Sequence, residues 1–485
     1  TNSIQYAGLR VLAGNAIPVV AVGDDDQSIY GWRGAKIENI QRFTEDFVGT
    51  QTVRLEQNYR STKTILDAAN GVISHNAGRL GKDLWTDGED GEPIKLYAGF
   101  NEQDEARFIV EQIQSWTYEG NPRKSSAILY RSNAQSRVIE EALIRVGLPY
   151  LIYAGHRFYE RLEIRNALAY MRLVIGRGDD PALERIINTP TRGIGSKTVD
   201  DLRAIARDNN VSMWQAMGLA QQNGLLGSRA RSSLSGFAAL INELDSETVE
   251  LPLEEMVEHV IHRTGLIDFH KAEKGERGQA RVENLEELVS AAKTFRAEDD
   301  SLSPLQQFLD SAALDAGDSQ ADPYEDSVQM MTLHSAKGLE FPLVILTGLE
   351  ENLFPHRMSV KEPGRLEEER RLAYVGITRA QQRLLITYAE SRRLHGSETY
   401  NTPSRFVREI PSDLIEEVRL HGGLTRPLSD RLQQPVGASN DSGLSLGQRV
   451  THPMFGEGMV LNIEGRGANA RIEVNFAEGS KWLVL

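Results

Sequence analysis

The sequence predicts an α/β protein with parallel sheets, an inserted helical segment and a small all-β module at its carboxyl end. The first observation is an alternation of strand and helix patterns from Pro93 onward, the rhythm of parallel βαβ units. The second is a series of long helical patterns that begins around Arg157. The third is a set of short alternating strands separated by glycine turns after residue 443, typical of a small β-barrel.

Composition limits the class of protein. A chain of 485 residues should hold three or four domains. The net charge of −15 argues against coating DNA through a basic surface, although it leaves room for a basic channel inside an acidic shell. The absence of cysteine excludes disulfides and fits a reducing compartment. No apolar run is long enough to cross a bilayer and no signal peptide is visible, so we expect a cytoplasmic protein without a membrane partner.

The stretch from Val19 to Ala35 carries the densest chemistry. Residues 17–22 form an apolar run that predicts a buried parallel strand, and three aspartates and Gln27 follow it, where α/β sheets place ligand chemistry. Tyr30, Trp32 and Arg33 come next between small glycines. Two interpretations fit these residues: a platform on which flat bases stack beside a cation, or a tight turn whose tryptophan fills the core.

The next segments continue the α/β pattern. Residues 52–73 read as a strand followed by a helix, with Tyr59 and Arg60 at the junction, where they could equally be an interface tyrosine and a surface arginine. Strands are predicted at 94–100 and 126–133, with a helix at 105–116 between them. Arg131 and Asn133 end the second strand, at the edge that usually carries function.

In the helical segment, Gly193 and Gly195 precede a helix start, whose free backbone N–H groups suit a phosphate, although a plain helix–helix turn explains them as well. Further on, Thr332, His334 and Glu340 lie in a loop between two strands, where a lone histidine is more often structural than catalytic. Residues 365–390 read as a charged helix leading into a strand, and the run of Glu and Arg in it would normally be a salt-bridged solvent face.

The run GDDDQSIYGWRGA at residues 23–35 resembles the third helicase motif of the UvrD/PcrA/Rep-type superfamily 1 DNA helicases. Later motifs follow in the family's order, and the resemblance covers nearly the whole chain. It implies RecA-like motor domains and an ATP-dependent 3′–5′ DNA helicase or translocase of DNA repair. The alternative is a non-catalytic DNA-binding or partner-docking remnant.

The resemblance also implies roles for single residues. Gln27 would sense the state of the nucleotide, Tyr59 would stack on adenine and Glu340 would bind the ribose. Arg60 and Arg379 would reach the γ-phosphate of ATP from two different segments. The remaining roles concern DNA: single-strand contacts by Tyr30, Trp32, Arg33, Arg131, Asn133, Thr332 and His334, and duplex phosphate contacts by Gly193 and Gly195 at a single-strand/duplex junction. The carboxyl-terminal module would dock repair or transcription proteins.

The resemblance divides the chain into six parts. These are a remnant of the first RecA-like motor domain (1–56), the first part of the second motor domain (57–153), an inserted helical domain (154–322), the second part of the second motor domain (323–422), a flexible linker (423–443) and a Tudor-like β module (444–485). No G-x-x-x-x-G-K-[ST] phosphate loop occurs, and the family's Asp-Glu-x-x-Asp magnesium ligands are not found, so we expect the carboxyl-terminal two-thirds of a helicase, with no metal ligand of its own.

A first prediction follows for the 485-residue chain. ATP hydrolysis should be negligible, because the lysine and backbone amides that cradle the β- and γ-phosphates belong to the phosphate loop. Phosphate release measured with and without single-stranded DNA tests this. DNA-stimulated hydrolysis that disappears on Arg379→Ala would contradict it.

Overall fold

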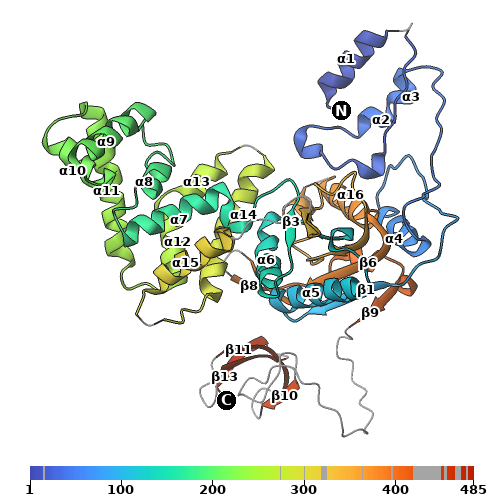
Figure 1. The fold of residues 1–485 in the computed structure, drawn as a ribbon. Helices are drawn as coiled ribbons and strands as arrows, with labels where there is room; N and C mark the ends of the chain where they lie inside the picture. Colours follow the sequence, from blue (N-terminus) through green and yellow to red (C-terminus); the bar gives the residue numbers. More distant parts are fainter. Residues whose placement is uncertain are drawn as a thin grey trace.

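The computed structural model describes residues 1–14, 17–273, 275–299, 301–317, 325–362, 364–394, 397–418, 449–452, 456–464, 471–476 and 479–484. Its main parts are a seven-stranded sheet, a group of helices and a separate four-stranded sheet. Figure 1 shows helices α7 to α15 gathered on one side of the large sheet, and the amino-terminal segment beyond its other side.

The seven-stranded sheet has the order β3-β4-β2-β5-β6-β1-β9, and every neighbouring pair is parallel. The large parallel sheet predicted from the βαβ rhythm is therefore confirmed. Its strands are β1 (Ile94–Gly99), β2 (Ser126–Tyr130), β3 (Tyr150–Ile152), β4 (Val328–Thr332), β5 (Phe341–Leu346), β6 (Ala380–Ala389) and β9 (Ile415–Glu417).

Helices cover both faces of this sheet, which explains why its strands read as continuous apolar runs. In β2, Ala127 and Leu129 belong to one core, whereas Ile128 and Tyr130 belong to the core on the opposite face. The first face packs against α4 (Lys63–Ile73) and α16 (Arg365–Ile377), and the second against α5 (Glu102–Tyr118) and α6 (Ser136–Arg145).

A group of helices that share one hydrophobic core stands between β3 and β4 in the chain. Tyr170, Phe237 and Phe308 are among its fully buried side chains. The helices are α7 (Leu162–Ile175), α8 (Asp180–Ile186), α9 (Ser196–Asn209), α10 (Met213–Gln222), α11 (Ser228–Thr248), α12 (Leu253–Arg263), α13 (Leu266–Lys271), α14 (Glu276–Thr294) and α15 (Pro304–Gly317). Helix α14 contacts α6, which covers the sheet: Glu287 accepts a hydrogen bond from Arg137 at 2.6 Å.

The amino-terminal segment corrects two predictions. Residues 17–22 and 52–56 form no strand, and Val20, Val22, Val53 and Leu55 are at least 80% exposed. A parallel strand is stable only when neighbouring strands satisfy its backbone and cover its faces, and no described strand pairs with either run. The described elements before α4 are helices and turns: α1 (Ser3–Ala13), the 3-10 turns η1 (Asp25–Gln27) and η2 (Gly31–Arg33), α2 (Glu38–Gln41) and α3 (Phe43–Asp46).

Near the carboxyl end, the strands β10 (Arg449–His452), β11 (Gly456–Glu464), β12 (Arg471–Phe476) and β13 (Gly479–Val484) form an antiparallel sheet in that order. β10 and β13 do not pair among the described residues, so a closed barrel stays a prediction. The predicted linker at 423–443 lies outside the described residues. No helix in the described part of the chain combines the length and apolarity needed to cross a membrane.

Candidate functional site

Helix α16 connects two groups of the predicted site residues. Arg379 lies two positions past its carboxyl end, whereas Glu368 lies in its first turn and accepts a hydrogen bond from the Gly31 N–H at 2.9 Å. The 13 residues of the helix span about 20 Å. The helix is not the solvent face that its charges suggested, because Glu369 and Arg370 are buried with partners of their own.

At the carboxyl end of α16, the structure brings Arg60 and Arg379 together; we call these two residues the arginine pair. Arg60 donates from Nη1 to the Thr378 carbonyl at 3.3 Å and from Nε to Glu340 at 2.5 Å. Arg379 is 2% exposed. Its guanidinium donates to three neutral acceptors, the carbonyls of Val375 (2.9 Å) and Leu339 (3.0 Å) and the hydroxyl of Thr378 (3.1 Å).

The electrostatics of the arginine pair favour an anionic ligand. Burial, followed by repulsion from Arg60, lowers the pKa of Arg379 to about 10. Among the described residues no carboxylate forms an ion pair with Arg379. A buried cation without a counter-ion is unfavourable even when neutral acceptors hold it, and an anion near the two guanidinium groups would relieve this. The pair therefore fits a phosphate group.

Tyr59 and Glu340 lie beside the arginine pair. The Tyr59 side chain is 87% exposed, so one ring face is open to a planar ligand. Its hydroxyl donates to Gln57 Oε1 at 2.8 Å. Glu340 also accepts from Gln381 Nε2 at 3.1 Å, and its carboxylate has lone pairs left for the hydroxyls of a sugar.

Gln27 is joined to this region through Lys337, which had no role in the sequence analysis. Lys337 Nζ donates to the Gln27 carbonyl at 2.7 Å and lies 5.3 Å from the centre of the Tyr30 ring. The only signal for Lys337 in the sequence was its place between His334 and Glu340.

The three aspartates before Gln27 could together hold a metal ion, but each already accepts from within the chain: Asp24 from Lys82, Asp25 from the Leu80 N–H and Asp26 from Arg79.

At the amino end of α16, the rings of Tyr30, Trp32 and His334 form a group that we call the aromatic cluster. The Tyr30 hydroxyl donates to the His334 carbonyl at 3.3 Å, and the ring centres lie 6.5 Å apart. Trp32 meets His334 edge-on at 6.4 Å and is half-buried there rather than in either core. The Arg33 guanidinium lies 4.5 Å over the Trp32 ring. The predicted aromatic residues and cation therefore share one surface.

His334 contributes to this surface as a neutral ring. Burial, and then the positive charge of Arg131, lower its pKa to about 4. It is therefore uncharged at neutral pH, which suits packing against Trp32 better than an ion pair with a phosphate.

The other predicted DNA contacts lie at the carboxyl ends of the paired strands β2 and β4. Arg131 donates to Glu369 through three hydrogen bonds of 2.7–3.0 Å, so its guanidinium is engaged. The Thr332 hydroxyl is 3.0 Å from that of Ser335. The Asn133 carbonyl accepts from Arg161 at 2.9 Å.

Gly193 and Gly195 are not part of this region. They lie before α9, in the group of helices to one side of the sheet (Figure 1). Gly193 has a φ of +75°, and Asn188 Oδ1 closes the turn by accepting from the N–H groups of Arg192 and Ile194. Gly195 is the N-cap of α9 and provides no side-chain cap to its N–H groups.

Two features of this region define a class of protein. The arginine pair lies beside an exposed tyrosine ring on a parallel α/β sheet, and helix α16 joins it to the aromatic cluster. This combination is typical of motor proteins that couple a nucleotide to a nucleic acid. Family models agree. Residues 53–391 match the UvrD-like helicase C-terminal domain, and residues 1–48 match the UvrD/REP helicase N-terminal domain. The chain belongs to the UvrD-like helicase family, a family of DNA helicase enzymes.

Individual relatives support the same assignment. The chain is 57% identical over 487 residues to DNA helicase II of Escherichia coli, covering 100% of this chain and 68% of that protein. It is 53% identical over 491 residues to DNA helicase II of Haemophilus influenzae, covering 100% and 67%. It is 40% identical over 503 residues to the ATP-dependent DNA helicase PcrA of Staphylococcus epidermidis, covering 100% and 68%.

Proposed function

We propose that this chain works as part of an ATP-dependent DNA helicase or translocase that moves 3′ to 5′ on single-stranded DNA, with DNA repair in the cytoplasm as its setting. The observation that carries the proposal is the placement of the arginine pair and the aromatic cluster at opposite ends of α16. The printed names of the relatives, DNA helicase II and ATP-dependent DNA helicase PcrA, support it.

ATP bound with Mg²⁺ supplies a γ-phosphoryl group whose transfer to water releases free energy. In our proposal, Tyr59 stacks against the base and Glu340 accepts from the ribose hydroxyls. Arg60 and Arg379 donate to the γ-phosphate and stabilise the charge that develops on it. Gln27 reports the state of the nucleotide, and we assign Mg²⁺ no ligand in this chain.

Helix α16 would transmit the effect of the nucleotide to the DNA. Arg371, near its middle, donates to the Ser28 carbonyl at 2.8 Å, and Glu368 holds the Gly31 N–H. Both contacts reach the loop that carries Tyr30 and Trp32. A shift of the helix when Arg379 engages a phosphate therefore moves the aromatic cluster and passes bases along it.

Single-stranded DNA would lie along the aromatic cluster, Arg33, Asn133 and Thr332, and Arg131 would exchange Glu369 for a phosphate. Gly193 and Gly195 would contact duplex phosphates at the junction, and the carboxyl-terminal β module would dock repair or transcription proteins. A non-catalytic DNA-binding or docking protein is the alternative, and it would keep the DNA contacts without turnover.

Replacement of Trp32 tests the DNA part of the proposal. Trp32→Ala should weaken single-strand affinity by roughly 1–3 kcal/mol, the usual worth of one stacked base, with little preference among sequences. Fluorescence anisotropy with labelled oligonucleotides of different composition measures the change. Tyr118→Ala is the control, because this ring is 92% exposed on α5 and should leave the affinity unchanged. Unchanged binding by Trp32→Ala, together with a large loss of thermal stability, would instead assign Trp32 to packing.

A further inference from the structure

Residues 85–92, which we call the brace, run beside the junction that carries Tyr59 and Arg60. Their backbone pairs with that junction at two places. The Trp85 carbonyl accepts from the Asn58 N–H at 2.7 Å, and the Trp85 N–H donates to the Glu56 carbonyl at 3.1 Å. Further along, the carbonyls of Glu89 and Asp90 accept from the N–H groups at the start of α4.

The start of α4 depends on the brace because its own residues do not cap it. Thr62 occupies the N-cap without a capping hydrogen bond, and the Ser61 hydroxyl donates instead to the Ala380 carbonyl at 2.6 Å. The N–H groups of Lys63 and Thr64 are satisfied by the brace carbonyls at 3.0 and 2.9 Å. Unsatisfied N–H groups at a helix start are unfavourable, so these bonds fix the direction in which α4 leaves the Tyr59–Arg60 junction.

The brace passes this junction at close range. Gly91 has a φ of +84°, and a Cβ built on it would lie 2.4 Å from the Thr62 hydroxyl oxygen. Glycine is therefore required there both by its backbone conformation and by the contact.

A chain of side chains extends from the brace to the exposed Tyr59 ring. Asp87 accepts from Gln57 Nε2 at 2.9 Å, and Gln57 Oε1 accepts from the Tyr59 hydroxyl at 2.8 Å. Because the ring is 87% exposed, packing does little to fix it. The hydrogen bonds through Gln57 to Asp87 are the contacts that orient it.

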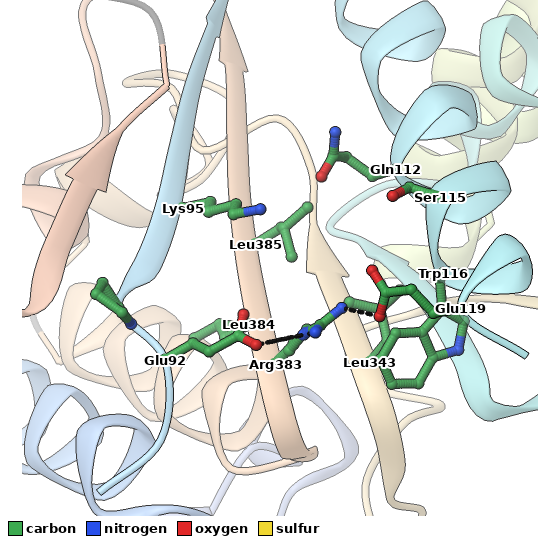
Figure 2. Close-up of a pocket in the computed structure, with 11 residues that line it drawn as sticks. Glu92, Lys95, Gln112, Ser115, Trp116, Glu119, Leu343, Arg383, Leu384 and Leu385 are labelled. Atoms are coloured by element: carbon green, nitrogen blue, oxygen red, sulfur yellow. Dashed lines mark hydrogen bonds and ion pairs between the residues drawn. The ribbon is translucent and has the colours of Figure 1, made fainter. Parts of the chain in front are cut away.

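Arg383 on β6 locks the end of the brace to the sheet. Figure 2 shows its guanidinium between two carboxylates, with the Trp116 ring close by. Its Nε donates to Glu92 at 3.0 Å, its Nη1 donates to Glu119 at 2.7 Å, and it lies 5.2 Å from the centre of the Trp116 ring. Glu92 ends the brace, whereas Glu119 and Trp116 belong to the α5 side of the sheet, so Arg383 ties the two together.

We propose that the brace holds Tyr59 and Arg60 in the geometry that receives a nucleotide, and that Arg383 is the positioning residue that keeps the brace in place. The inference rests on the proposed function for the identity of the ligand. Arg383 touches neither Tyr59 nor Arg60, and it acts through Glu92 and the carbonyls that cap α4. Asp87 acts on the Tyr59 ring through Gln57.

Hydrogen exchange of the chain as it stands tests the brace without any nucleotide. In Arg383→Gln, the amides of Asn58, Lys63 and Thr64 should exchange about tenfold faster, because the brace opens more often. Arg383→Lys should restore part of the protection through one remaining ion pair. Arg203→Gln, which removes a similar pair with Glu184 in the group of helices, should leave these amides unchanged. Equal exchange in Arg383→Gln and the wild type would overturn the proposal.

Steady-state kinetics then test positioning, in a protein in which a phosphate-loop domain is joined to the amino end of this chain. Arg383→Gln and Asp87→Ala should each raise the KM for ATP by about threefold to tenfold and leave kcat nearly unchanged, because a ground-state binding geometry is loosened. Faster exchange with an unchanged KM would overturn the positioning role. Tyr59→Ala tests the proposed function separately from the brace. If this variant leaves the KM for ATP unchanged, the proposed stacking of adenine on Tyr59 is wrong, whatever the hydrogen-exchange data show for the brace.

Discussion

Arg379→Lys is expected to lower ATP turnover by about 10³-fold or more, the range of arginine fingers, while the apparent affinity for ATP changes little. The Arg379 guanidinium is fixed by three neutral acceptors, the Val375 and Leu339 carbonyls and the Thr378 hydroxyl. A lysine ammonium cannot reproduce that planar arrangement. The charge of Arg379 also matches the transition state better than the ground state, so its loss should appear in kcat rather than in KM.

Arg60→Lys is expected to lower ATP turnover for the same reason, since Glu340 and the Thr378 carbonyl orient the planar Arg60 guanidinium. Turnover is measured as phosphate release in a protein in which a phosphate-loop domain is joined to the amino end of this chain. Single-strand binding without nucleotide is the control and should persist, because neither arginine belongs to the aromatic cluster. Turnover like that of the wild type in Arg379→Lys would refute the geometric argument even though the two arginines lie close together.

The parallel sheet could be predicted from the sequence because its strands are covered on both faces. Burial of most residues on both faces gives the apolar runs at β1, β2 and β5, and polar residues then mark the strand ends. The runs at 17–22 and 52–56 have the same local pattern and form no strand. An apolar run indicates only that a segment can be buried between other strands. Whether it forms a strand depends on neighbouring strands that pair with it, and the local sequence carries no information about those neighbours.

The site was predictable only where the resemblance supplied it. Arg60 and Thr378, which precedes Arg379, are 318 positions apart in the chain, and no periodicity connects them. Arg131 and Glu369, 238 positions apart, form a buried pair that the analysis of the sequence missed, because each charge taken alone looks like a surface residue. The brace was missed for a related reason. Its effect on α4 depends on main-chain carbonyls, which carry no residue signature.

The second large effect is expected on the free energy of unfolding, when the buried ion-pair network of Glu105, Glu350 and Arg392 is broken. The side chains of these three residues are 3%, 0% and 7% exposed. Arg392 donates from Nη2 to Glu350 at 2.6 Å and also to Glu105. Glu105 further accepts from the hydroxyls of Thr347 and Thr387. The network joins α5, the loop after β5, the end of β6 and the short strand β7 (Ser391–Leu394), which carries Arg392, so it holds the carboxyl edge of the sheet together.

Arg392→Met should lower the free energy of unfolding by about 3–5 kcal/mol, because it leaves two buried carboxylates without their cation. Urea unfolding followed by hydrogen exchange of β1 and β6 measures this loss in the sheet itself. The control is Arg203→Met, which removes a pair with similar geometry but with side chains 52% and 33% exposed. Exposed pairs contribute little, so this variant should unfold like the wild type. Equal losses in the two variants would show that burial is not the cause.

The pH dependence of this loss of stability distinguishes a buried carboxylate left without its cation from a packing defect. In the wild type, burial alone would raise the pKa of Glu105, but Arg392 and the hydrogen bond from Thr387 bring the pKa below its ordinary value. Glu105 therefore contributes stability above the unfolded pKa of about 4.3, and this stability is lost as the pH falls through the folded value. In Arg392→Met, burial raises the pKa of Glu105 instead, so stability falls as the pH rises from about 4.3 to the raised value. The difference between the two proteins should widen from pH 4 to pH 7, whereas a packing defect would give the same difference at every pH.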